Sequence, residues 1–349
     1  MNRSIYIDTL RAVACIAVIV VHISGGNEWY SQKTPTFDWI IMNIYDSLAR
    51  WCVPIFLMIS GALFLNPEKK NISLQKLYTH NILRIVKAFI FWSSIYALYN
   101  YYTIQNPTIT TSFIVPFLSG HFHMWFLWLI AGLYMLVPIL RLIAENKEIM
   151  KYFLLISLVF SFAIPFFFKI TDICIPMLQP LTRLGKGYCE DLHLHMLSGY
   201  TFYFVLGYYL HTTSLSRKTE NFLIALGIGA SICIAAISYY LFHTTSIPHG
   251  DFYEYNTLLV LLEATAVFIV VKRRTIKENS MPSIIISQIS KRSFGIYLIH
   301  MLVIEALGIT ATSTNPIFGI PLFSILVLAI SYGVISILAR IPIINKWAI

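Results

Sequence analysis

Runs of about twenty apolar residues, separated by short polar breaks, repeat along most of the 349-residue chain. A run of this length is what an α-helix needs to cross the hydrocarbon core of a bilayer. The pattern predicts an all-α fold, a polytopic integral membrane bundle of about ten transmembrane helices, in a single domain over residues 1–349. The predicted spans cover residues 5–25, 38–65, 82–103, 122–143, 151–168, 196–212, 221–242, 253–271, 290–309 and 317–340.

Basic residues are distributed unevenly between the two sides of this predicted bundle. Of the 25 lysines and arginines, four fall in segments on one side, namely Lys33, Lys169, Arg183 and Lys186, and Arg50 falls within a span. Because cytoplasmic segments collect Lys and Arg, both termini are predicted to be cytoplasmic, N-in and C-in. The polar stretch 169–195 then becomes a long outer loop, too short to form a core of its own.

The composition excludes a soluble protein, since 57% of the residues are hydrophobic and 12% are charged. A net charge of +9 would suggest a nucleic-acid partner in a soluble chain. Here the excess of basic residues follows from topology and from attraction to membrane lipids, and no nucleic-acid motif is present. We therefore expect contact with membrane lipids and not with nucleic acid.

The first predicted helix carries three ionisable residues on one face. At ~100° per residue, Asp8, Arg11 and His22 lie within about 40° of one line along it. Ionisable groups inside a span are costly and usually serve a functional site or pathway. A neutral imidazole can take a proton from a hydroxyl, so His22 is the candidate general base, with Asp8 and Arg11 as further catalytic candidates. The alternative is a histidine that only hydrogen-bonds a neighbouring helix.

Other charged residues allow weaker predictions. Arg84 and Lys87, one turn apart at the start of the third span, could bind phosphates, or they could be ordinary cytoplasmic flanking residues. Asp46 and Arg50 are four apart and are expected to form a structural pair on one helix face. Glu305, in the ninth span, needs a partner that the sequence does not name.

Four histidines near the predicted outer face are candidate metal ligands, namely His121, His123, His193 and His195. Residues two apart diverge by about 200° on a helix, so each pair could converge only from a loop or strand. We therefore expect no metal.

Five short motifs appear in a recognisable order along almost the whole chain. The first is YIDTLRA at 6–12, whose Arg11 is followed by His22 after ten intervening residues. The others are VPIFLMISG at 53–61, RI at 84–85, HMWFL at 123–127 with Tyr134 and Pro138, and SFGIYLIH at 293–300. Together they resemble the bacterial membrane acyltransferase family 3, whose members include polysaccharide O-acetyltransferases.

The resemblance implies a multi-pass protein of the bacterial inner membrane that moves an acetyl group from cytoplasmic acetyl-CoA to a hydroxyl of a cell-surface or lipid-linked glycan. It implies that His22 acts as a base or as an acyl carrier, and that Arg11, Arg84 and Lys87 hold the CoA phosphates. The substrate cavity would be lined by motif residues, namely Ser60, His123, Trp125, Tyr297 and His300.

Tyr297 and His300, three apart on the ninth span, share a face and could line one cavity, or they could be a polar pair between helices. For the whole protein, the alternative function is a transporter or flippase for a lipid-linked sugar or small anion, in which buried charges form the translocation path. Only an enzyme would transfer or hydrolyse the acetyl group of acetyl-CoA. The acceptor glycan and the oligomeric state are beyond what the sequence indicates.

Overall fold

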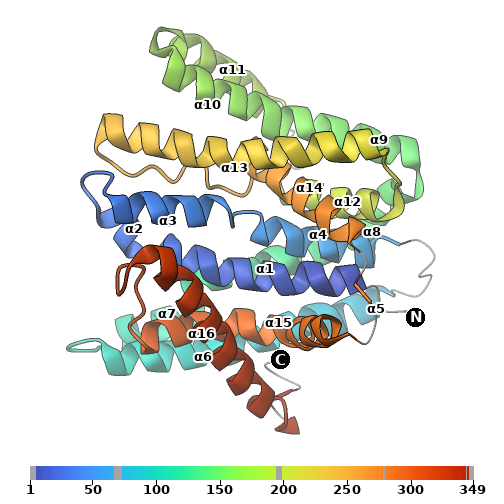
Figure 1. The fold of residues 1–349 in the computed structure, drawn as a ribbon. Helices are drawn as coiled ribbons and strands as arrows, with labels where there is room; N and C mark the ends of the chain where they lie inside the picture. The colour runs from blue at the N-terminus through green and yellow to red at the C-terminus, as the bar shows by residue number, and fades with distance from the viewer. Residues whose placement is uncertain are drawn as a thin grey trace.

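The computed structural model describes residues 5–66, 73–193, 199–274, 276–277, 280–342 and 344–345. Over these residues all regular secondary structure is helical, which confirms the all-α prediction (Figure 1). The elements are α1 (Ile5–Ser24), α2 (Asn27–Ser31), α3 (Phe37–Ser47), α4 (Cys52–Phe64), α5 (Leu74–Lys76), the π-helical η1 (Leu77–Ile82), α6 (Leu83–Thr103), the π-helical η2 (Ile109–Ile114), α7 (Val115–Ser119), the 3₁₀ turn η3 (Phe122–Met124), α8 (Trp125–Glu145), α9 (Lys147–Ser157), the π-helical η4 (Leu158–Ala163), α10 (Ile164–Cys174), the 3₁₀ turn η5 (Pro176–Leu178), α11 (Gln179–Asp191), α12 (Tyr200–Thr212), α13 (Arg217–Thr245), α14 (Leu258–Arg273), α15 (Met281–Ala306) and α16 (Pro316–Leu338).

Seven helical stretches among the described residues are long and apolar enough to cross a membrane. They are Ile5–Ser31, Phe37–Phe64, Leu74–Thr103, Ile109–Glu145, Lys147–Cys174, Arg217–Thr245 and Pro316–Leu338. The three other predicted spans fall on α12, α14 and α15, of 13, 16 and 26 residues. The first two are shorter than a full crossing of ~20 residues. The count of ten spans and the N-in, C-in orientation stay predictions.

The helix α1 crosses the middle of the bundle and packs against α15, α4 and α16 (Figure 1). Most of its residues are buried, including Leu10, Ala14 and Ile19. Arg11 lies in the N-terminal half of α1 and His22 in its last turn, so the two residues lie toward opposite ends of the bundle. We call these the Arg11 end and the His22 end.

The predicted span 38–65 is broken into α3 and α4, which lie end to end in Figure 1. Pro54, in the first turn of α4, has no N–H, and its ring would clash with the carbonyl of Arg50 in a continuous helix. Asp46 and Arg50 form their ion pair beside this break, as predicted, and Asp46 is 1% exposed. The guanidinium of Arg50 also lies over the ring of Tyr253, 4.5 Å from its centroid.

The stretch 169–195, expected to be a loop, is largely helical. The helix α10 continues to Cys174, and α11 packs back against it as a hairpin. Asp172 holds the two helices together, because its carboxylate accepts hydrogen bonds from Thr182 and from Lys186, the latter at 2.6 Å. The sequence pattern missed this hairpin because α11 has few apolar residues.

The helices α4 and α12 approach so closely that their backbones touch. A Cβ added at Gly61 would overlap the carbonyl oxygen of Phe204, and one added at Gly207 would overlap the backbone of Met58. Small residues permit this kind of contact between membrane helices. The contact fixes α4, which carries the second motif, in the bundle.

Candidate functional site

A cavity of about 330 Å³ opens at the Arg11 end between α1, α4, the η1–α6 segment, α8 and α15. Its polar wall includes Arg11, Ser60, His80, Asn81, Arg84 and Lys291. Among the described residues that line it, none is acidic. We call it the basic cavity. Three cations without a lining carboxylate make it suitable for an anion, and Arg forks favour phosphate.

Side chains from two helices hold the basic groups in place. Ser290 of α15 donates a hydrogen bond to the carboxylate of Asp8 at 2.7 Å, and Arg11 reaches the Ser290 hydroxyl at 3.5 Å. Asp8 is 5% exposed and does not line the cavity, so it joins α1 to α15 next to Arg11. The guanidinium of Arg84 lies over the ring of Phe294, 5.2 Å from its centroid.

Four of the predicted site residues, Arg11, Ser60, Arg84 and Tyr297, therefore line one cavity although they come from four helices. Lys87 was predicted with them, but it is not among the residues that line the cavity. Four further polar residues on the wall were in neither the predicted site nor the motifs: His80, Asn81, Ser290 and Lys291. The first two lie on the π-helical η1, whose wider turn no sequence pattern signals.

At the His22 end, the imidazole rings of three histidines meet. The ring centroids of His22 and His300 are 5.1 Å apart, those of His123 and His300 are 5.2 Å apart, and those of His22 and His123 are 6.4 Å apart. They come from α1, the turn η3 and α15. His123 and His300 are almost fully buried. The edge of Phe122 covers His22, with 5.5 Å between ring centroids.

A fourth histidine and an acid extend this cluster. His121 Nε2 lies 2.9 Å from Glu305 Oε1, and His121 Nδ1 lies 2.7 Å from His123 Nδ1. A carboxylate accepts, so His121 Nε2 donates to Glu305, and one hydrogen lies between the Nδ1 atoms of His121 and His123. His123 Nε2 is buried and has no hydrogen-bond partner among the described residues.

His300 is oriented by a backbone carbonyl. Its Nδ1 donates to the carbonyl of Tyr297 at 2.6 Å, so its Nε2 carries a lone pair, buried and without a hydrogen-bond partner in the described part of the chain. The hydroxyl of Tyr297 donates to the carbonyl of His123. An imidazole nitrogen that can accept a proton therefore lies in the cluster that contains His22.

The basic cavity and the histidine cluster approach each other through Phe56 and Tyr297. Both residues line the cavity, and both also line a narrow void that reaches Cys15, Ile296 and His300. This void has no room for a water molecule. The two sites are therefore neighbours along α1, separated by two aromatic side chains.

The structure places the remaining candidates as follows. Trp125 does not line the basic cavity; its ring stacks on Tyr255 at 5.9 Å and lies 5.8 Å from Tyr200, beside the histidine cluster. His121 and His123 do converge, because Gly120 (φ +72°) ends α7, His121 precedes the 3₁₀ turn η3 in an extended conformation, and His123 lies within that turn. No group of three or more possible ligands among the described residues could hold a metal, and His195 lies outside them.

The comparisons with known proteins identify the family of the chain. A family model described as an acyltransferase domain matches residues 4–337, so the chain belongs to membrane acyltransferase family 3, and the resemblance is confirmed. Similar proteins from Staphylococcus aureus strains MSSA476, MRSA252 and Mu50 are each named "probable poly-beta-1,6-N-acetyl-D-glucosamine export protein". Each is 23% identical over 341 residues, which cover 93% of this chain and 91% of the relative. No solved structure matches the chain significantly.

Proposed function

We propose that this membrane acyltransferase moves an acetyl group from acetyl-CoA to a hydroxyl of a cell-surface or lipid-linked glycan. The observation that carries the proposal is the position of a phosphate-compatible basic cavity and of a histidine cluster along one helix, α1, with Phe56 and Tyr297 between them. Family membership supports the acyl transfer. The nature of the donor and of the acceptor follows from the chemistry of the two ends.

We infer the acyl donor from the positive charge of the basic cavity. CoA carries several phosphates on one end and its thioester on the end of a long, thin arm. Arg11, Arg84 and Lys291 offer cations for the phosphates, and Ser60, His80 and Asn81 add hydrogen-bonding groups. With the predicted N-in orientation this end faces the cytoplasm, where acetyl-CoA is available. The arm would then extend between Phe56 and Tyr297 toward His22.

The histidine cluster supplies the proton chemistry. In the direct route, His22 takes the proton of the glycan hydroxyl, the hydroxyl oxygen bonds to the thioester carbon, the carbon–sulfur bond breaks, and the CoA thiolate receives a proton. In the covalent route, a ring nitrogen of His22 carries the acetyl group between donor and acceptor. In both routes the lone pair on His300 Nε2 can receive the proton from His22.

We infer the acceptor from the names of the relatives and from the position of the histidine cluster at the His22 end. Their names concern a polymer of N-acetylglucosamine, a neutral chain rich in hydroxyls. A similar chain, or a lipid-linked precursor, is the acceptor that we propose, reached at the outer face of the bacterial inner membrane.

Export is the second candidate function, because the relatives are named as export proteins. A polymer would need a continuous passage from one end of the bundle to the other. In the described residues the link between the basic cavity and the histidine cluster is a void that does not admit water. A thin acyl-bearing arm needs much less displacement of side chains than a saccharide chain, which favours transfer over export.

The experiment is acetyl transfer by purified protein in proteoliposomes. Radiolabelled acetyl-CoA is supplied on the side of the Arg11 end and a saccharide acceptor on the side of the His22 end. Transfer of label to saccharide by the unmodified protein, and not by His22→Ala, supports the proposal. Saccharide movement across the bilayer without acetyl-CoA, and without label transfer, would establish export instead.

A further inference from the structure

A larger cavity, of about 680 Å³, lies at the His22 end, between the η4–α10 segment, α11, the end of α13 and the loop 246–257. The loop packs over the segment that follows α1, since Tyr253 contacts Trp29 with 5.4 Å between ring centroids. The volume is within the ~300–1,000 Å³ of typical ligand sites. None of the residues predicted for the site lines it.

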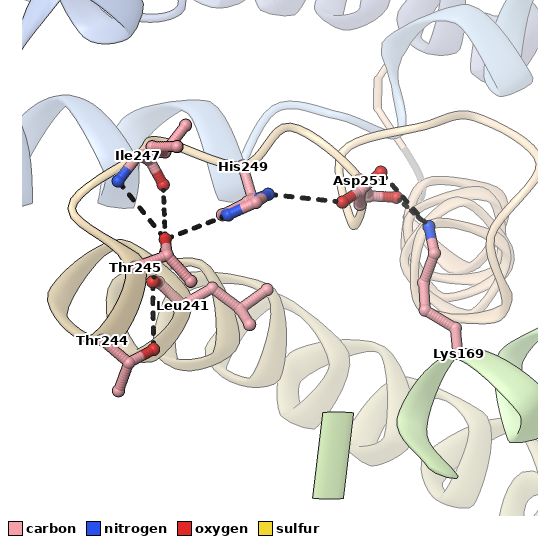
Figure 2. A network of polar contacts seen from close by, with 7 residues as sticks. All are labelled: Lys169, Leu241, Thr244, Thr245, Ile247, His249 and Asp251. Carbon is pink, nitrogen blue, oxygen red and sulfur yellow. Dashed lines mark hydrogen bonds and ion pairs between the residues drawn. The ribbon is translucent and has the colours of Figure 1, made fainter. Parts of the chain in front are cut away.

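Charges on the rim of this cavity occur in pairs, and Figure 2 shows the pair formed by Lys169 and Asp251. Lys169 Nζ donates to the carbonyl of Asp251 at 2.9 Å and lies 3.8 Å from its carboxylate. Lys186 pairs with Asp172 at 2.6 Å. Glu190 adds a third acid. We call this the paired-charge cavity, and it differs from the basic cavity because its two ammonium groups face three carboxylates.

The rim is held by local hydrogen bonds at the end of α13, which Figure 2 shows. The hydroxyl of Thr245 donates to the carbonyl of Leu241 at 2.7 Å and accepts from the N–H of Ile247 at 3.3 Å. His249 Nε2 lies 3.0 Å from the same hydroxyl, and its Nδ1 lies 3.7 Å from the Asp251 carboxylate. The polar groups of the rim are therefore fixed before a ligand arrives.

The inner wall is aromatic with one polar exception. Phe160, Phe162, Phe166 and Phe168 line it, and so does Ser161. The Ser161 hydroxyl is buried and has no hydrogen-bond partner in the described part of the chain. Phe160, Ser161 and Phe162 lie on the π-helical η4, and such segments occur frequently at functional sites.

Aromatic contacts lead from the paired-charge cavity toward the histidine cluster. Gly199 and Asn256 line the cavity, and their chain neighbours Tyr200 and Tyr255 both contact Trp125. From Trp125 the ring contacts continue to Phe126 at 6.3 Å, from Phe126 to Tyr297 at 5.6 Å, and from Tyr297 to His123 at 5.5 Å. A ligand that extends from this cavity past Trp125 would therefore be directed toward the histidine cluster.

We propose that the paired-charge cavity binds the acceptor, and that the acceptor segment held there is an uncharged saccharide. Sugar rings combine apolar C–H faces, which fit the phenylalanine wall, with hydroxyls, which fit the paired polar rim and Ser161. An anionic saccharide would meet the surplus of carboxylates and bind less well. The inference rests on the proposed function and adds where its acceptor binds and which charge it carries.

Binding is tested separately from catalysis, with the protein in lipid nanodiscs and saturation-transfer NMR. The probes are a neutral pentamer of β-1,6-linked N-acetylglucosamine and its O-sulfated counterpart. We expect the neutral pentamer to bind at least tenfold more tightly than the sulfated one. Equal binding, or tighter binding of the sulfated probe, overturns the assignment of an uncharged segment.

Two matched pairs of variants locate the site. Asn256→Trp places a large ring in the cavity, whereas Glu254→Trp, also exposed on the same loop, does not. Ser161→Phe fills the inner wall, and Leu155→Phe, on an exposed position of α9, is its control. We expect each cavity variant to weaken pentamer binding at least tenfold, each control to stay within about twofold, and CoA binding to be unchanged in all four.

The outcomes separate this inference from the proposed function. If the unmodified protein transfers acetyl groups but Asn256→Trp and Ser161→Phe bind the pentamer normally, the function stands and the acceptor lies elsewhere. If the unmodified protein binds the pentamer, both variants lose this binding, and the unmodified protein transfers no acetyl group, the cavity is a saccharide site and the proposed reaction is wrong.

Discussion

Replacing Arg84 with alanine should weaken the binding of CoA about 5- to 10-fold, whereas replacing Lys87 should change it less than about twofold. Both residues lie on α6, one turn apart, but only Arg84 lines the basic cavity. A hydrogen bond to a charged group contributes about 1.5–3 kcal/mol, and each 1.4 kcal/mol corresponds to about a factor of ten. We expect a smaller contribution than this, about 1–1.4 kcal/mol, because the Arg84 side chain is exposed and water screens its charge.

The assay is displacement of radiolabelled CoA from nanodisc-embedded protein at two salt concentrations. Arg84→Lys should recover part of the affinity, because it keeps the charge and loses the guanidinium fork. Higher salt should weaken binding to the unmodified protein more than to Arg84→Ala, since one cation is missing in the variant. Equal losses for Arg84→Ala and Lys87→Ala, or none for either, would refute the assignment of this cavity to the donor.

Three further changes address the other parts of the account. His22→Ala should abolish acetyl transfer but leave CoA binding and membrane insertion intact, which activity and displacement assays would separate. Glu305→Ala should lower kcat by about 10²-fold, the lower bound for a proton-transfer defect, with the KM for acetyl-CoA unchanged, because Glu305 orients His121 beside His123; a normal kcat would show that this contact takes no part in proton transfer. Gly61→Ala should destabilise the protein by about 1–3 kcal/mol in thermal unfolding, because the methyl group would overlap α12, whereas Gly132→Ala, with open space around it, should not.

The helical pattern and the shared face of α1 were predictable because both depend on local periodicity. Apolar runs located most of the helices, and ~100° per residue placed Arg11 and His22 on one side of α1. The Asp46–Arg50 pair was predictable for the same reason, since residues four apart are neighbours on a helix. The break at Pro54 and the α10–α11 hairpin were not predicted, because a window average hides a single proline and an amphipathic hairpin.

The site was only partly predictable because its contacts join distant parts of the chain. Glu305 and His121 are 184 residues apart, and no periodicity relates them. Lys291 comes just before the fifth motif, and no sequence pattern relates it to Arg11, although both residues line the basic cavity. The family motifs identified Ser60 and Tyr297 as site residues. That both line one cavity with Arg11 depends on how the helices pack, which the motifs do not show.

The central claim is that the two ends of α1 serve one group transfer. The most direct measurement is mass spectrometry of a neutral N-acetylglucosamine oligomer after incubation with acetyl-CoA and proteoliposomes that contain the protein. We predict that the oligomer gains one or more acetyl groups with the unmodified protein and with Lys87→Ala, and none with His22→Ala. An oligomer that crosses the bilayer with its mass unchanged, equally in all three proteins, would contradict the account.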